Sequence, residues 1–170
     1  VIEAARVHRD MVFSIAGDGP LRRELTDAAR ACPNLRLLGW LDREALRAEV
    51  DDHDLLLLPS HFESFGTIAL EAMVRERLVM VSSGCGITQW PDLCPGLTII
   101  DPSQSAAEAL TQLRARTPAE RRQRACTAAQ VASALNERCL AHWCELLTHT
   151  VAQRSTLPSV PPPAVASVLD

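Results

Sequence analysis

The chain has 170 residues, of which 47% are hydrophobic, and a formal net charge of −4 at pH 7. This length suits one domain with a sizeable core, and the negative balance argues against nucleic acid or an anionic membrane surface as a partner. No apolar run approaches the roughly 18 residues of a membrane span, and because all 17 basic residues are Arg, no lysine is present to hold a phosphate.

The chain begins at Val1, directly in helix-like sequence and without the charged and apolar segments of a signal peptide. We therefore expect it to begin partway into a domain. Five apolar runs predict strands: "MVFSIAG" (11–17), "LRLLG" (35–39), "DLLLLP" (54–59), "LVMVS" (78–82) and "LTIID" (97–101). None shows the in–out alternation of a half-exposed sheet, which favours parallel strands covered on both faces.

Amphipathic segments separate these runs. Pro20 stands at a first helical position, and the apolar residues that follow share one face: Leu21, Leu25, Ala28, Ala29 and Cys32. Asp42 can cap "REALRAEV", residues 64–66 precede "TIALEAM", and Ser103 precedes "QSAAEALTQLRAR". This alternation predicts an α/β fold with a doubly wound, parallel, Rossmann-like sheet.

The sequence after Asp101 is helical. Thr117 can cap "TPAERRQRACTAAQVASAL", and a last helix at about 134–150 gathers apolar side chains on one side: Cys139, Trp143, Leu146 and Leu147. We expect residues 1–150 to form the folded domain and residues 151–170 to form a proline-rich disordered tail.

Ligands of such sheets bind beyond the carboxyl ends of the strands, where the loops 17–20, 39–42 and 59–66 should meet. The third loop leads into a helix whose free N–H groups favour an anion, and Gly66 allows close approach of a phosphate. Glu63 lies in this loop and Glu71 about two turns into the helix. Carboxylates accept hydrogen bonds from vicinal hydroxyls, so the arrangement suits a sugar–diphosphate–nucleoside. On spacing alone, two solvated surface glutamates remain the alternative.

The sequence motif that contains Glu63 and Glu71 makes the prediction specific. "P-S-x-x-E-S-F-G-x-x-x-x-E-A-M" (59–73), preceded by "G-D-G-P" (17–20) and "L-x-G-W-L" (37–41), resembles the C-terminal, nucleotide-sugar-binding domain of family 4 retaining glycosyltransferases of the GT-B fold. The likeness runs from about residue 1 to residue 147. It implies that residues 1–150 are most of the C-terminal half of such an enzyme, with C-terminal helices and an incomplete amino end.

The resemblance also implies roles for individual positions. Glu63 matches the glutamate near the hydroxyls of the donor sugar, which makes it the catalytic candidate, and Glu71 matches the glutamate that holds the ribose. The remaining matched positions divide among three parts of the donor site: Ser64, Phe65, Gly66 and Thr67 at the diphosphate, Gly17 in the first facing loop, and Trp40 and Leu41 beside the nucleobase. The family needs neither a metal nor a cofactor.

The sequence departs from the family pattern at three places. The Arg and Lys that usually clamp the diphosphate would precede Val1, and this chain has no Lys. Glu76 and Leu78 stand where the family has a helix-ending Gly and a strand-starting Pro, and Gln89 stands where Glu is common. The first departure predicts that this chain alone has little or no activity.

Two rival sites are weaker. Asp52-His53-Asp54 forms the D-x-D of metal-dependent glycosyltransferases, but here it precedes a strand instead of following one. Cys139 and Cys144 could join His142 and His149 at a metal, yet the two thiols lie roughly 140° apart on a helix at about 100° per residue. We therefore expect no metal site.

The sequence thus predicts a metal-independent, retaining hexosyltransferase. Its partners would be a UDP- or GDP-sugar, a glycan or lipid-linked acceptor, and a missing N-terminal GT-B domain, with no nucleic acid. The expected location is cytoplasmic or peripheral to the inner face of the plasma membrane. Two alternatives stay open: a degenerate or split nucleotide-sugar-binding module without catalysis of its own, and a fragment of a GT-B nucleotide-sugar epimerase.

Overall fold

A computed structural model describes residues 1–154, with side chains to residue 150. The chain divides into two compact units, Val1–Leu135 and Asn136–Asp170. Most of the expected proline-rich tail (151–170) lies outside the described residues. No helix among those described is long and apolar enough to cross a membrane.

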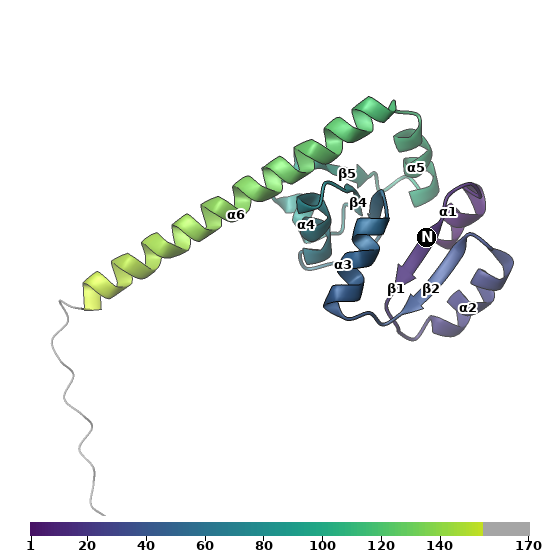
Figure 1. Ribbon diagram of the computed structural model, residues 1–170, viewed down its shortest axis with the longest axis horizontal. Helices are drawn as coiled ribbons and strands as arrows, with labels where there is room; N and C mark the ends of the chain where they lie inside the picture. Colours follow the sequence, from purple (N-terminus) through teal and green to yellow (C-terminus); the bar gives the residue numbers. More distant parts are fainter. Residues whose placement is uncertain (155–170) are drawn as a thin grey trace, which may run out of the picture. The chain divides into compact units, whose positions relative to one another are not determined.

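Strands and helices alternate through the first unit (Figure 1). Their order is α1 (Ile2–Val7), β1 (Phe13–Ala16), α2 (Arg22–Ala31), β2 (Leu35–Gly39), α3 (Arg43–Asp52), β3 (Leu55–Leu58), α4 (Thr67–Val74), β4 (Leu78–Ser82), the short 3-10 helices η1 (Gly86–Gln89) and η2 (Cys94–Gly96), β5 (Leu97–Ile100), α5 (Ala106–Arg114) and α6 (Pro118–Arg154). All five predicted strands are present, and the predicted α/β fold class is confirmed.

The strands form two parallel sheets, although the sequence predicts one. β1 pairs with β2, while β3, β4 and β5 pair in that order. Within the described part of the chain, no backbone ladder joins β1 to β3. Among the described residues, β1, β2, β3 and β5 each have a paired strand on one side only.

The core consists of two hydrophobic clusters in the first unit. One gathers Ala4, Ala5, Phe13, Met80 and Leu110, from α1, β1, β4 and α5. The other lies around α4, β4 and the start of α6. β4 is buried along Leu78–Val81, because it has a paired strand on each side and helices over both faces.

Helix ends follow local sequence chemistry. The predicted cap Asp42 accepts a hydrogen bond from the Ala45 N–H at 2.8 Å. α5 begins after Ser105, two residues beyond Ser103, because Ser105 and Glu108 form a reciprocal capping box. Thr117 caps α6 as predicted, with its Oγ1 accepting from the Glu120 N–H at 3.2 Å.

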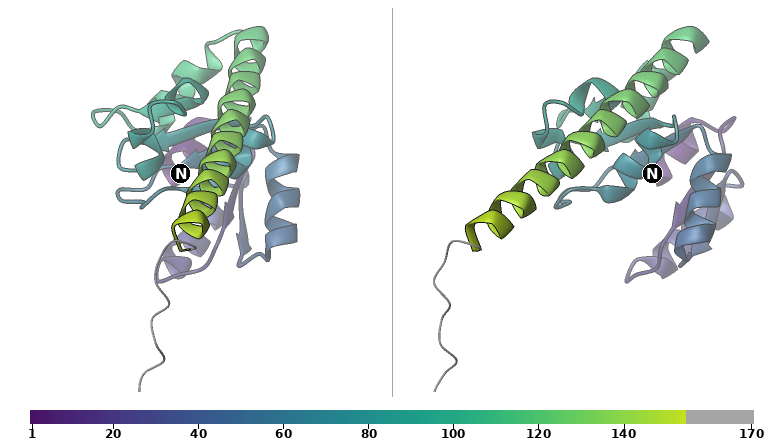
Figure 2. Two further views of the ribbon diagram at one scale, coloured as in Figure 1. Left: turned by 90° about the vertical axis from the view of Figure 1, so that its left-hand side faces the viewer. Right: turned by 60° about the vertical axis from the view of Figure 1, so that its left-hand side comes forward.

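The prediction of two helices after Thr117 is wrong. α6 is one unbroken helix in every view (Figures 1 and 2) and runs for 37 residues. After Pro118 it contains no Gly or Pro, so nothing in its backbone chemistry stops the first helix near residue 135.

Candidate functional site

The loop after β3 is held by the loop after β4. The Glu63 N–H donates to the Gly84 carbonyl at 3.2 Å, and the Gly86 N–H donates back to the Glu63 carbonyl at 2.8 Å. The Ile87 N–H then donates to the Phe65 carbonyl at 2.8 Å. Glu63 and Cys85 thereby form an isolated parallel bridge. Two backbone bonds of Glu63 and one of Phe65 therefore hold this loop against the loop after β4.

Two glycines permit this close approach. A Cβ on Gly84 would lie 2.2 Å from the His61 carbonyl oxygen, and a Cβ on Gly86 would lie 1.9 Å from the Ser64 carbonyl oxygen. Real Cβ atoms do not come so near to backbone oxygen, so any larger residue at either position must displace the loop. The "G-C-G" stretch is therefore part of the framework of the site.

Gly66 stands at the amino end of α4. It has φ 93°, a left-handed conformation that favours glycine, and no side chain caps the helix that follows. The helix therefore presents uncapped N–H groups and the positive end of its dipole beside the loop. Thr67 and Ser64 are exposed at this end, as a backbone anion site requires.

The two predicted carboxylates lie on consecutive parts of this framework, Glu63 in the loop and Glu71 in α4. Both residues are half-buried. The Ser64 hydroxyl donates to Glu63 Oε1 at a long 3.4 Å. Neither carboxylate forms an ion pair with a residue that the structure describes. Both keep acceptor capacity for another molecule's hydroxyl groups.

The side chain of Phe65 attaches the loop to the hydrophobic core. Its ring meets Trp90 edge to face, with 5.9 Å between the ring centroids, and it packs against the core cluster that contains Ile87 and Leu93. Its side chain is thus structural. The predicted role of Phe65 concerns its backbone, whose carbonyl accepts from the Ile87 N–H.

The other two loops belong to the β1–β2 sheet. Gly17 has φ 121°, and its N–H donates to the Gly39 carbonyl at 2.6 Å. Both glycines line a hollow of about 330 Å³ that also contacts Asp18 and Leu25. Trp40, next in the chain, is 82% exposed.

These predicted residues form two groups. One joins Gly17 to the loop that carries Trp40 and half-buried Leu41; the other joins Glu63, Ser64, Phe65, Gly66, Thr67 and Glu71. Across the described residues, no hydrogen bond or ring contact links the two groups. The structure places Glu63 beside the Gly66 helix end, where a Cβ on Gly66 would lie 3.5 Å from Glu63 Cγ, and Glu71 lies farther along α4.

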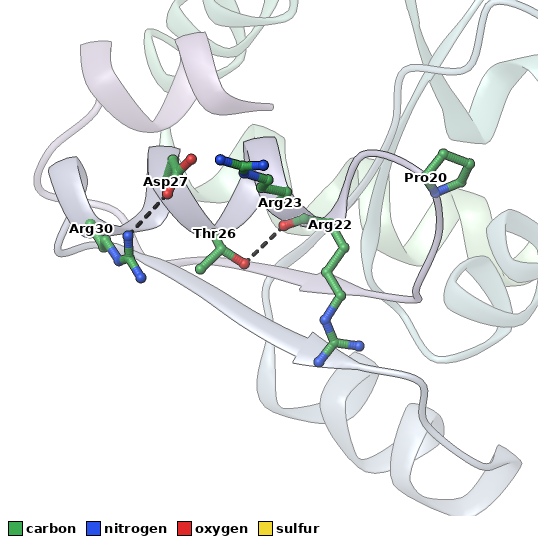
Figure 3. Close-up of a pocket in the computed structure, with 6 residues that line it drawn as sticks. All are labelled: Pro20, Arg22, Arg23, Thr26, Asp27 and Arg30. Carbon is green, nitrogen blue, oxygen red and sulfur yellow. Dashed lines mark hydrogen bonds and ion pairs between the residues drawn. The ribbon is translucent and has the colours of Figure 1, made fainter.

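A second, wider hollow of about 570 Å³ lies along α2 (Figure 3). Charged side chains line it, and Arg30 bonds Asp27 at 3.0 Å. Arg22 is paired with Asp18. Since these arginines neutralise neighbouring carboxylates and no predicted site residue lines the hollow, we do not place the functional site there.

The sequence reasoning missed the role of the loop after β4. Its signal was present: two glycines flank Cys85, directly after a predicted strand that adjoins β3. The carboxyl ends of neighbouring parallel strands lie at one edge of a sheet, so the loops after β3 and β4 had to meet.

Sequence comparison identifies relatives of the chain. Residues 1–116 match the family model described as glycosyl transferases group 1. Glycogen synthase of Mycobacterium tuberculosis is 41% identical over 70 residues, covering 39% of this chain and 17% of the relative. The 2-deoxystreptamine glucosyltransferase of Streptomyces kanamyceticus is 32% identical over 120 residues, covering 69% of this chain and 30% of the relative.

Solved structures share the fold. Sucrose-phosphate synthase of Thermosynechococcus elongatus has a TM-score of 0.70 at 20% identity, over 89% of this chain and 42% of that protein. WaaG, a glycosyltransferase involved in lipopolysaccharide biosynthesis, has a TM-score of 0.65 at 21% identity, over 78% and 38%. HepE of Anabaena, solved with UDP-glucose, has a TM-score of 0.62 at 17% identity, over 76% and 39%.

The chain spans less than half the length of each of these proteins. The family match nevertheless covers most of the first unit, from α1 through α5. The chain belongs to the group 1 glycosyltransferases.

Proposed function

We propose that this chain is the donor-binding part of a retaining, metal-independent glycosyltransferase, which transfers a hexosyl group from a UDP- or GDP-sugar to a glycan or lipid-linked acceptor. One observation carries the proposal. Glu63 and Glu71 are half-buried carboxylates without a cationic partner among the described residues, and they lie on either side of a helix end that begins at left-handed Gly66.

Each part of this arrangement fits one part of a nucleotide sugar. Backbone N–H groups of Ser64–Thr67 and the dipole of α4 stabilise the diphosphate. Glu63 accepts hydrogen bonds from the hydroxyls of the sugar, and Glu71 accepts them from the ribose. The complexes of HepE with UDP and with UDP-glucose support a ligand of this class.

In the transfer, the bond between the anomeric carbon and the diphosphate oxygen breaks, and its electron pair stays with the diphosphate. A bond from the acceptor hydroxyl oxygen forms on the same face of the sugar, and the hydroxyl proton passes to the departing diphosphate. The positive end of α4 stabilises the charge that develops on this leaving group. The acceptor binds on a second domain, and the reaction takes place in the cytoplasm or at the inner face of the plasma membrane.

Calorimetric titration with UDP and GDP tests the ribose contact. The Glu71→Ala variant should bind the preferred nucleotide about 10- to 100-fold more weakly, because a hydrogen bond to a charged group contributes about 1.5–3 kcal/mol. Glu44, exposed in the first turn of α3, provides the control, and Glu44→Ala should bind like the parent chain. Equal losses in the two variants, or no binding by the parent chain, would contradict the proposal.

The transferase and synthase names of the relatives described above favour group transfer over epimerisation. Turnover of a UDP- or GDP-sugar by the purified chain, in the absence of a second domain, would refute the proposal that this chain only binds the donor.

A further inference from the structure

One end of the first unit concentrates positive charge. The segments 3–10 and 108–124 contain seven Arg against four acidic residues, while the rest of the chain contains ten Arg against 17 acidic residues. These segments adjoin in space, because α1 packs on α5, which leads into α6 (Figure 1). We call this region the basic end, and its arginines are Arg6, Arg9, Arg114, Arg116, Arg121, Arg122 and Arg124. The net charge of −4 for the whole chain does not describe it.

Side-chain bonds hold the segments of the basic end together. Arg114 in α5 donates to the carboxylate of Asp10, which follows α1, at 2.9 Å to Oδ1. The same guanidinium lies 3.1 Å, Nη1 to Nδ1, from buried His8. The Arg121 side chain of α6 donates to the Arg114 carbonyl at 3.2 Å. The arrangement of arginines across α1, α5 and α6 is therefore set by the fold.

The acidic residues of the basic end do not neutralise it. Glu108 and Glu120 each accept a hydrogen bond from the backbone N–H of the residue that caps their helix, at 2.8 Å and 2.7 Å. Burial, and then the like charge of Arg116, lower the pKa of Arg124, which shows that positive charge is crowded here. Four exposed arginines form no ion pair and no side-chain hydrogen bond with a described residue: Arg6, Arg9, Arg116 and Arg122.

The basic end lies at the opposite edge of the strands from the donor loops. α1 ends before β1 begins, and the turn between α5 and α6 follows a helix that returns from the carboxyl end of β5. The loops that carry Gly17 and Glu63 instead follow the carboxyl ends of β1 and β3. Neither hollow described above is lined by a residue of the basic end. The basic end is therefore separate from the candidate donor site.

Two exposed valines adjoin arginines of the basic end along the chain. Val7 follows Arg6 and is 59% exposed, and Val12, three residues after Arg9, is 51% exposed. A soluble polyanion would pair with the guanidinium groups and leave the valines in water. A lipid surface accommodates both kinds of side chain, because arginines reach the phosphates while apolar groups enter the boundary of the acyl chains. The combination favours an anionic lipid surface over nucleic acid or an acidic polysaccharide.

We propose that the basic end docks on an anionic lipid surface. Its unpaired arginines contact the phosphate groups, and Val7 and Val12 lie at the base of the headgroup layer. Docking at this edge of the strands leaves the donor loops, at the other edge, clear of the lipid. The inference does not depend on which nucleotide sugar the chain binds.

Co-sedimentation with lipid vesicles at about 0.1 M salt tests the inference. The vesicles contain either equal parts of phosphatidylglycerol and phosphatidylcholine or phosphatidylcholine alone. The basic-end variant combines Arg9→Gln, Arg116→Gln and Arg122→Gln. A matched control makes the same change in net charge at exposed positions of α2 and α3: Arg23→Gln, Arg43→Gln and Arg47→Gln.

The parent chain should bind the anionic vesicles and not the neutral ones. The basic-end variant should bind them about 100-fold more weakly, because each arginine near such a surface contributes about fivefold. The matched control should bind like the parent chain. No binding to anionic vesicles by the parent chain, or equal losses in the two arginine variants, would overturn the inference.

A valine variant separates a lipid surface from a soluble polyanion. Val7→Ser combined with Val12→Ser should weaken binding to anionic vesicles several-fold and leave binding to heparin unchanged, because heparin has no apolar phase. Vesicle binding that is equal in this variant and the parent chain would overturn the inference. The basic-end variant should bind UDP or GDP like the parent chain, so the vesicle test and the nucleotide titration can fail independently.

Discussion

At the scale of single residues, the position of Glu63 depends on Gly86. A Cβ at this position would lie 1.9 Å from the Ser64 carbonyl oxygen, while a Cβ at Gly19 would have nothing within 4 Å. Gly86→Ala should therefore destabilise the protein by about 1–3 kcal/mol and speed hydrogen exchange at Glu63 and Ile87. Denaturant unfolding and hydrogen exchange measure both effects. Gly19→Ala is the matched control, and an equal unfolding midpoint in the two variants would contradict the prediction.

Glu76 adopts a backbone conformation that favours glycine. It has φ 55°, the only positive φ of a non-glycine residue among those described. The Glu76 N–H donates to the Met73 carbonyl at 3.0 Å, and the Arg77 N–H donates to the Ala72 carbonyl at 3.0 Å. These bonds form a Schellman motif at the end of α4, in which the left-handed position is usually Gly.

The Glu76→Gly substitution should therefore stabilise the protein by about 1 kcal/mol, because it removes the steric cost of a left-handed non-glycine residue. Chemical denaturation measures the change. Glu76→Ala separates backbone strain from loss of charge, since it removes the carboxylate and keeps the Cβ. If the alanine variant is as stable as the glycine variant, strain at this position is not the cause.

Asp10 links stability to pH. The guanidinium of Arg114 donates to both of its carboxylate oxygens, at 2.9 Å to Oδ1, and this hydrogen bonding lowers the pKa of Asp10 from 3.8. A lowered folded-state pKa gives a stabilisation that is present above 3.8 and is lost as pH falls through the lower folded value. Asp10→Asn should therefore flatten the fall in Tm as the pH drops below about 3.8. The Asp52→Asn control, at an exposed carboxyl, should follow the parent chain.

At the scale of elements, the sequence predicted what local chemistry decides. The strands at 35–39 and 78–82 and the cap at Asp42 match the structure, because apolar runs and short polar side chains act within a few residues. The single helix α6 was missed, since its buried positions end at Leu135 while exposed apolar residues such as Trp143 and Leu147 follow, and periodicity alone reads that change as a second helix.

The candidate site also combines features that a local sequence pattern predicts with features that it does not. Gly66 and the start of α4 were predictable from a local pattern. The contact between Glu63 and Gly86 depends on backbone bonds between segments more than 20 residues apart, which only strand adjacency brings together. Whether Trp40 and Leu41 take part in the same site stays a prediction, because they follow a strand of the other sheet.

At the scale of the whole molecule, sequence alone predicted an α/β fold of parallel strands, and it did not predict their division into two sheets. Alternating strands and helices fix the class of fold, because a parallel neighbour needs a crossover. Strand order is set by which edges pair, and among the described residues no ladder joins β1 to β3. The four leucines of β3, which is paired on one side only, are half-exposed. In β4, which is paired on both sides, Leu78–Val81 are buried.

The contact between Phe65 and Trp90 also gives the molecule an optical property. The chain contains three Trp and no Tyr, so its near-ultraviolet emission comes from tryptophan alone. Trp40 and Trp143 are 82% and 63% exposed, whereas Trp90 is 44% exposed and meets the ring beside Gly66. Water quenches and red-shifts the first two, and the blue side of the spectrum therefore reports on the surroundings of Phe65 without any added dye.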